Sequence, residues 1–255
     1  MIKCFLQRRW ITVWYRNWKV WQKLFVPSLL ANFAEPIMIL VGLGYGLGFF
    51  IGKVQDMPYI VFLTAGTLCN STMNTATFEG LYSAYTRMAI QQTWHGMLVT
   101  PLEVDDIIIG EIMWAATKSL INVSAILIVA SGLGIATHWQ VLWVLPIMLL
   151  VGICFAAIAL VITSLANSYD FFLYYSTLVI TPLTLLSGVF FPLEQLPLPI
   201  QQIVLFLPLA HAVNLTRPLI IGQLPFPWFS LSIIILYSII ATYLAIVLTK
   251  RRLCY

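Results

Sequence analysis

Long stretches without a charged residue constrain this chain more than any other feature. They lie at 36–52, 57–78, 119–169, 171–193, 195–216 and 218–249. A helix needs about 20 apolar residues to cross a bilayer. Charged residues make up only 9% of the chain and hydrophobic residues 61%, against about 25% and 45–50% in soluble domains. This excludes a soluble enzyme, a nucleic-acid-binding protein and a disordered chain, and it indicates a multi-span membrane protein.

The charge-free runs predict an all-α fold with six transmembrane helices over 28–255. We expect the helices at roughly 28–51, 58–79, 107–135, 141–165, 171–192 and 228–249. The run 119–169 must contain parts of two of them, separated near 137–140. Three prolines interrupt the run 195–216. Because proline removes a backbone donor, we expect the segment 193–227 to be external and interfacial or re-entrant.

The placement of lysine and arginine predicts that both termini lie in the cytoplasm. With this orientation only two basic residues lie outside, Lys53 and Arg217, and Lys118 lies within a span. The remaining ten lie inside: Lys3, Arg8, Arg9, Arg16, Lys19, Lys23, Arg87, Lys250, Arg251 and Arg252. The net charge of +4 therefore indicates orientation and not a nucleic-acid partner.

Residues 1–27 are expected to form an amphipathic helix that lies in the plane of the membrane surface. At 100° per residue, one face is basic, with Arg8, Arg9, Arg16, Lys19 and Lys23, and the opposite face carries Trp10, Trp14, Trp18 and Trp21. Such a helix places its indoles at headgroup depth and its cations toward anionic lipid and water. It is either a simple anchor or a support that also holds a partner protein against the membrane.

Several polar and aromatic residues within the predicted spans are candidates for a transport pathway. Thr67, Asn70, Asn74 and Thr77 share one face of the second span, where they either bond neighbouring helices or line a hydrated path. Lys118 and Glu111 lie on nearly the same face of the third span. Lys118 is either a functional cation, part of a structural ion pair or a side chain that snorkels to the surface.

Aromatic residues gather near the start of the fifth span, at Phe171, Phe172 and Tyr175. They fit an aromatic belt at the membrane interface. Alternatively, they contact the sugar rings or acyl chains of a substrate.

No catalytic, nucleotide-binding or metal-binding motif is evident. The segment Gly48–Val54 lacks both the spacing and the Ser or Thr of a phosphate-binding loop. The histidines show no metal-ligand spacing, and no histidine accompanies the acidic residues Glu103, Asp105, Asp106 and Glu111. We therefore expect no enzymatic activity, cofactor or metal on this chain.

The longest loop on the predicted cytoplasmic side is 80–106. Residues 82–97 have helical composition, few charges and several large side chains. This is typical of a helix that docks into a groove on another protein, although a helix on the membrane surface would look similar.

Long motifs in this loop and beyond resemble one transporter family. They include Phe78–Met88, Thr93–Thr100 and Asp106–Glu111, and later Ser168–Phe172, Leu178–Pro182, Leu207–His211 and Arg217–Pro218. Over essentially its whole length the chain resembles the permeases of nodulation-factor exporters (NodJ type), which belong to the ABC-2 class of ABC transporters.

The resemblance implies a six-helix ABC-2 permease that works as a homodimer in the bacterial inner membrane. Two copies of a separate ATPase subunit would bind ATP and magnesium. The loop helix around 84–97 would contact this ATPase, flanked by the N-terminal connecting helix. The candidate coupling residues are Glu79, Tyr85, Arg87, Gln91, Trp94 and His95. In the family an acidic residue often follows the tryptophan, whereas in this chain His95 follows Trp94.

The implied substrate is a lipo-oligosaccharide or a similar amphiphile that is moved outward. Related permeases export drugs or polysaccharides, which remain alternatives. An ion-coupled secondary transporter or channel would instead use Glu35, Glu111 or Lys118. A membrane enzyme acting on lipid-linked sugars would use the carboxylates at 103–111.

Overall fold

The computed structural model describes residues 8–23, 25, 34, 37–55, 57–224 and 227–254, which are almost entirely helical. Residues 1–7 and most of 28–36, where the first span is predicted to begin, lie outside the described residues. The elements are α2 (Trp10–Gln22), η1 (Ile39–Tyr45), α4 (Gly46–Ile51), β1 (Lys53–Val54), β2 (Met57–Pro58), α5 (Tyr59–Phe78), η2 (Glu79–Ser83), η3 (Thr86–Ile90), α6 (Thr93–Leu98), α7 (Val104–Gly132), η4 (Trp139–Trp143), α8 (Val144–Leu165), α9 (Asp170–Tyr175), η5 (Ser176–Ile180), α10 (Thr181–Leu186), η6 (Leu193–Gln195), α11 (Leu198–Val204), α12 (Pro208–Ile220) and α13 (Trp228–Cys254).

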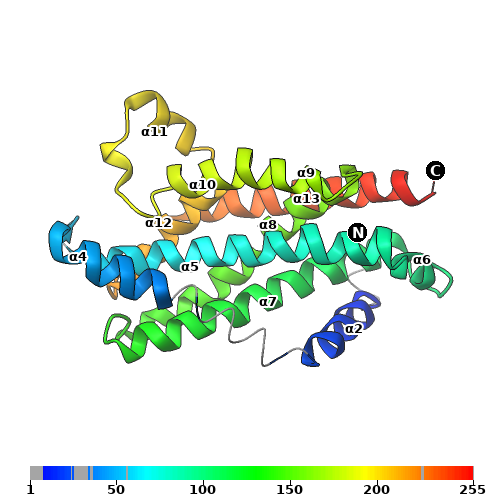
Figure 1. Ribbon diagram of the computed structural model, residues 1–255, viewed down its shortest axis with the longest axis horizontal. Coiled ribbons are helices and arrows are strands. Elements are labelled where there is room, and N and C mark those ends of the chain that lie inside the picture. The colour runs from blue at the N-terminus through cyan, green and yellow to red at the C-terminus, as the bar shows by residue number, and fades with distance from the viewer. Residues whose placement is uncertain are drawn as a thin grey trace.

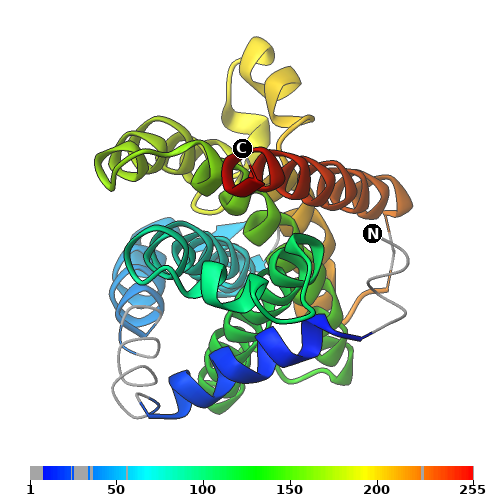
Figure 2. The ribbon, with the colours of Figure 1, turned by 90° about the vertical axis from the view of Figure 1, so that its right-hand side faces the viewer.

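The long helices run beside one another along the long axis of the molecule (Figure 1). Helix α8 packs against α5, α7 and α13, and α12 packs against α5 and α13. Helices α2 and α6 lie toward the end that holds the C-terminus, whereas α4 and α11 lie toward the opposite end. In Figure 2, which looks along the bundle, α2 runs across the view. This is the direction expected for a helix that lies parallel to a membrane surface.

Small residues let α8 approach its neighbours closely. A Cβ added to Gly152 would come within 2.5 Å of the Ser119 hydroxyl oxygen on α7, and one added to Gly80 within 2.6 Å of the Ala159 Cβ. The hydroxyl of Thr163 on α8 donates to the carbonyl of Gly80 at 2.7 Å. Close packing of this kind drives helix association in lipid. It also holds the segment after α5 in place, which carries the charged residues Glu79 and Arg87.

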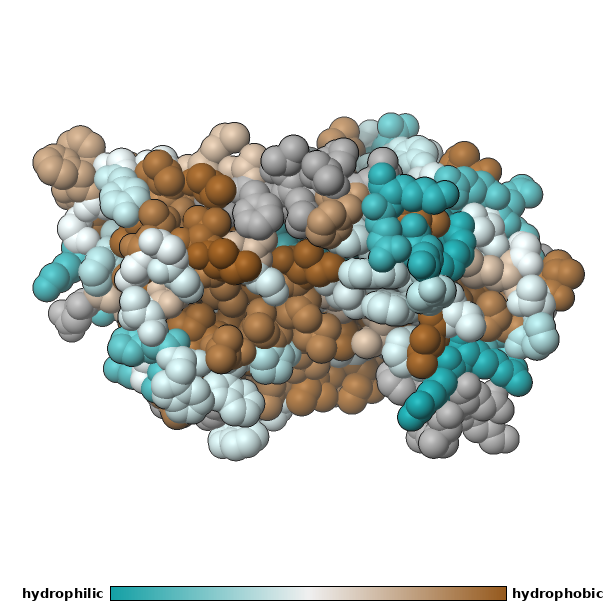
Figure 3. Space-filling model, turned by 90° about the horizontal axis from the view of Figure 1, so that it is seen from below, coloured by the Kyte–Doolittle hydropathy of each residue, from teal (hydrophilic) through white to brown (hydrophobic). Residues whose placement is uncertain are grey.

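Three described helices are long and apolar enough to cross a membrane, namely Val104–Gly132, Trp139–Leu165 and Trp228–Leu253. They correspond to the predicted spans 107–135, 141–165 and 228–249, and the chain turns between the first two at 133–138. Figure 3 shows hydrophobic residues across the middle of one face and hydrophilic residues gathered toward its ends. Such a band is expected of a protein that spans a bilayer.

The remaining predicted spans correspond to shorter or more polar helices. Helix α5 has 20 residues and is therefore about 30 Å long, but it contains several Thr and Asn residues. Shorter apolar helices occupy Ile39–Ile51 and Asp170–Leu186. The latter ends before the predicted residue 192 because the chain turns at Gly188, where φ is +75°. The number of six spans stays a prediction.

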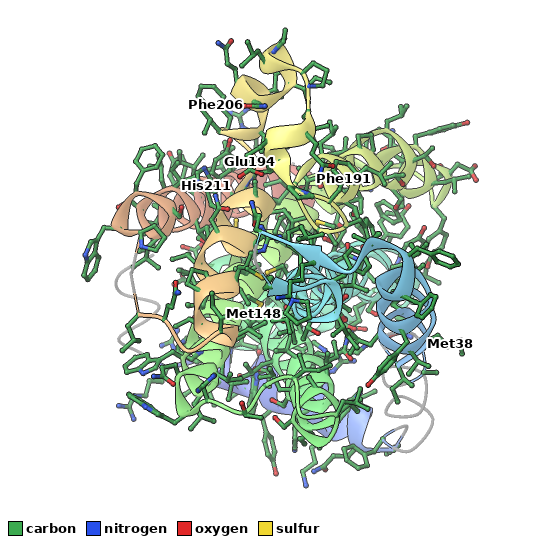
Figure 4. All side chains as sticks on the ribbon, turned by 90° about the vertical axis from the view of Figure 1, so that its left-hand side faces the viewer. Met38, Met148, Phe191, Glu194, Phe206 and His211 are labelled. Atoms are coloured by element: carbon green, nitrogen blue, oxygen red, sulfur yellow. The ribbon has the colours of Figure 1, made fainter. Side chains whose placement is uncertain are left out.

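The proline-containing segment forms a sharp elbow and not a straight span. Helices α11 and α12 meet at 85°, and Figure 4 shows Phe206 at this bend and His211 on α12. The imidazole of the buried His211 lies 3.0 Å from the Ser230 hydroxyl of α13 and 2.8 Å from the Leu205 carbonyl. This side chain therefore joins the elbow to α13. The depth of the elbow in the membrane stays a prediction.

Helix α2 packs against α7 through the face that carries its tryptophans. The Trp14 indole N–H donates to the Thr117 hydroxyl at 3.0 Å, and the buried Trp21 lies with its ring centroid 6.1 Å from that of Trp114. We expected both indoles among lipid headgroups. The structure instead places them against protein, because the small Gly110 lets α2 approach α7 closely.

Replacing Gly110 with valine should destabilise the docking of α2. A Cβ at this position would lie 2.6 Å from the Val13 Cβ and 2.9 Å from the Trp10 carbonyl oxygen. Overpacking of this kind costs about 1–3 kcal/mol, measurable as a lower thermal unfolding midpoint of the purified protein. Gly132 on the same helix has nothing within 4 Å, so the matched control is Gly132→Val. Equal losses in the two variants would contradict the proposed packing.

Candidate functional site

Four charged side chains meet where α5 continues into η2 and η3 beside α7. They form three ion pairs: Arg87 with Glu111 at 2.6 Å, Arg87 with Glu79 at 3.0 Å, and Lys118 with Glu79 at 2.7 Å. The side chain of Glu111 is only 1% exposed and that of Glu79 only 4%. We call these four residues the charge cluster. Their formal charges sum to zero.

Both carboxylate oxygens of Glu79 accept hydrogen bonds. Oε1 accepts from Arg87 at 3.0 Å and from the Trp114 indole at 2.9 Å. Oε2 accepts from Lys118 at 2.7 Å and from the Ser83 hydroxyl at 3.1 Å. Glu79 begins the π-helical turn η2, a departure from α-helix that is frequent at functional sites. A carboxylate this buried is tolerated only with such complete pairing.

Glu111 joins three further parts of the chain. Arg87 binds it bidentately, through Nε at 3.0 Å and Nη2 at 2.6 Å. The Trp94 indole of α6 donates to Oε1 at 3.2 Å, and the Asn17 amide of α2 donates to Oε2 at 3.1 Å. Burial alone would lower the pKa of Arg87, but Glu111 and Glu79 together raise it above its ordinary value. The cluster therefore ties α2, η3 and α6 to α7.

The candidate coupling residues divide into an inward and an outward set. Trp94 is buried at 1% exposure and Tyr85 at 5%, and the Tyr85 hydroxyl donates to the Asn167 carbonyl at 2.8 Å. Together with Glu79 and Arg87 they face the protein interior. Gln91 and His95 are exposed. Any effect of Trp94 on a partner would therefore be indirect.

The polar face of α5 contacts a neighbouring helix. The Asn70 side-chain oxygen accepts from Asn74 at 3.3 Å and from the Thr184 hydroxyl of α10 at 3.1 Å. The Thr67 hydroxyl bonds back to the carbonyl of Leu63. The buried Thr77 hydroxyl has no partner among the described residues. The stripe thus joins α5 to α10, and Thr77 leaves one polar atom free.

The three aromatic candidates near the start of α9 are placed differently. Phe172 is fully buried and meets Tyr82 and Tyr85 edge-on, with ring centroids 5.3 and 5.2 Å away. Phe171 is 42% exposed. Tyr175 lines an apolar pocket of about 540 Å³ between α8, α10, α11 and α13. Phe171 and Tyr175 are therefore the two that a ligand could reach.

Lys118 does not pair with Glu111, although the two share a helix face. Its ammonium bonds Glu79, which is 39 residues away in the chain. The acidic residues at the start of α7 also have structural partners. Glu103 and Asp106 cap the helix reciprocally, and Asp105 pairs with Lys250 at 2.6 Å. The carboxylates proposed for a membrane enzyme are therefore engaged in capping a helix or in an ion pair.

Several long apolar helices, with the buried charges beside them paired, define a multi-span membrane protein. The chain belongs to the ABC-2 type transporter family, whose model matches residues 8–221. It is 44% identical to nodulation protein J of Rhizobium leguminosarum bv. viciae over 96% of this chain and 95% of that protein. It is 42% identical to nodulation protein J of Rhizobium meliloti (strain 1021) over 96% and 94%. The inner membrane transport permease YadH of Escherichia coli (strain K12) is 25% identical over 75% and 73%.

Proposed function

We propose that this chain is the membrane subunit of an ATP-driven exporter. Two copies would form the permease, and two copies of a separate ATPase would bind ATP and magnesium. The cargo is a lipo-oligosaccharide or a related amphiphile, moved outward across the bacterial inner membrane, with both termini in the cytoplasm. The observation that carries this proposal is the similarity to nodulation protein J along 96% of the chain.

The placement of α6 supports the contact with an ATPase. This short helix lies at the end of the molecule that also holds α2 and the C-terminus (Figure 1). Its outward side carries the exposed His95, the exposed Gln91 lies just before it, and Val99 at its end is 90% exposed. Its inward residue Trp94 bonds Glu111 on α7. A partner that binds the outer side would thereby act on the charge cluster through the inner side.

The charge cluster would transmit this movement to the membrane helices. Arg87 belongs to the same loop as α6 and holds both Glu79 and Glu111. Lys118 follows Glu111 on α7 by about two helical turns and extends the network by that length. Binding of ATP elsewhere would shift the population between inward- and outward-open arrangements, since α5, α7 and the loop are joined at this point.

The polar stripe of α5 and the exposed aromatic side of α9 are the proposed pathway. Asn70 and Thr184 join α5 to α10, so relative motion of these helices would change the polar surface they present. Phe171 of α9 and Phe78 of α5, 42% and 62% exposed, would face the second copy or the cargo. Phe171 would contact an acyl chain or a sugar ring of the cargo, as Tyr175 would from its pocket.

Reconstitution with the ATPase whose gene lies nearest to the gene for this chain tests the proposal. In proteoliposomes that contain both subunits, we expect transport of a lipo-oligosaccharide only with ATP, and none with a non-hydrolysable analogue. Omitting the ATPase subunit is the matched control. Transport by this chain alone under an ion gradient would instead identify a secondary transporter. Turnover of a lipid-linked sugar without ATP would identify a membrane enzyme.

A further inference from the structure

A pocket of about 290 Å³ opens beside the charge cluster, and its lining carries an excess of positive charge. The charged residues that line it are three cations, Arg16, Arg87 and Lys118, and one carboxylate, Glu79. Both oxygens of Glu79 already accept hydrogen bonds from neighbouring side chains. The carboxylate is therefore compensated, and a further anion in the pocket would meet the N–H groups that the three cations leave unused.

Of these three cations, Arg16 is the one that forms no ion pair with a described carboxylate. Its guanidinium donates to the Asn17 side-chain oxygen at 3.0 Å, and no ion pair forms between it and any described residue. Burial and the nearby Arg87 lower the pKa of Arg16, and the carboxylate of Glu111 offsets only part of this effect. A half-buried cation in this situation is stabilised by an added anion.

The other two cations also retain unused donors. Arg87 engages its glutamates through Nε and Nη2, and Nη1 has no partner in the described part of the chain. Lys118 uses one of its three N–H groups on Glu79. Phosphate oxygens accept readily from such guanidinium and ammonium groups. Three cations around one pocket therefore match a phosphate group.

The rest of the lining indicates where the phosphate comes from. Val20 and Trp21 of α2 add apolar surface to the pocket, and α2 runs across the end of the bundle (Figure 2). The exposed Lys19 is on the same helix. This combination suits a headgroup with its glycerol backbone. We propose that the pocket binds the phosphate of an anionic phospholipid from the membrane leaflet beside α2.

Native mass spectrometry of the purified protein from nanodiscs tests this site. With phosphatidylglycerol we expect a retained lipid whose affinity falls about tenfold in Arg16→Gln, because one charge-assisted contact is lost. Arg16→Lys should restore part of it. The matched control is Lys19→Gln, which removes the same charge from the exposed side of the same helix. Equal losses in Arg16→Gln and Lys19→Gln, or none in either, would overturn the proposal.

A second arm separates a lipid from a free anion. In phosphatidylcholine nanodiscs, inorganic phosphate at millimolar concentration should not raise the thermal unfolding midpoint, whereas phosphatidylglycerol should raise it in the unsubstituted protein but not in Arg16→Gln. Stabilisation by phosphate alone would overturn the lipid assignment. Neither readout depends on ATP or cargo, so failure here is distinguishable from failure of the proposed transport function.

Discussion

Replacing Glu111 with leucine is expected to lower the free energy of unfolding by about 3–5 kcal/mol. The substitution leaves the Arg87 guanidinium, 14% exposed, with only Glu79 as an anionic partner. It also leaves the indole of Trp94 and the amide of Asn17 without their acceptor. The charge cluster then has a net charge of +1 in a buried site. Thermal or denaturant unfolding in nanodiscs would measure the loss.

The double variant Glu111→Leu with Arg87→Leu distinguishes electrostatics from packing. Removing both residues restores a neutral cluster, in which Lys118 still pairs with Glu79. We therefore expect the double variant to be more stable than the sum of the single losses predicts. The control is Lys19→Leu, which removes an exposed charge that forms no ion pair with any described residue and should cost at most about 0.5 kcal/mol. Glu111→Leu within that range would contradict a stabilising cluster.

Charge-free runs predict much of the bundle because a bilayer excludes charge along the whole length of a helix. The predicted spans 141–165 and 228–249 agree with Trp139–Leu165 and Trp228–Leu253 to within a few residues. The three prolines of 195–216 likewise predict the region of the 85° elbow. Such features are local, so one sequence suffices to find them.

The pairing of charges is not local and could not be predicted in the same way. Lys118 and Glu111 share a helix face, but the ammonium bonds Glu79 on another helix. The sequence placed Arg87 and Trp94 in a loop expected to meet a partner, and Glu79 at the end of the span before it. Their inward orientation depends on how η2 and α6 pack against α7, with η3 between them. The position of Glu79 at the end of a predicted span could have signalled that it bonds within the protein, since a carboxylate there needs a partner.

Introducing an aspartate at Val99 is expected to weaken binding of the proposed ATPase subunit about thirtyfold or more. Val99 is 90% exposed at the end of α6, and no Asp, Glu, Lys or Arg lies between Gln91 and Leu102. A helix that docks into a groove relies on apolar anchors. Placing a carboxylate at such a position costs at least about 2 kcal/mol when the position is a hot spot. Titration of the ATPase onto the permease in nanodiscs would measure the affinity.

Two comparisons separate this contact from a general loss of structure. Leu198→Asp changes an apolar residue of α11 that is 75% exposed at the opposite end of the molecule, so it should leave ATPase binding unchanged. Trp94→Ala should lower the unfolding midpoint, because Trp94 is buried and donates to Glu111. Val99→Asp should lower the affinity at an unchanged midpoint. If Val99→Asp bound the ATPase normally, the outer side of α6 could not be the contact, and Trp94 would act within the permease alone.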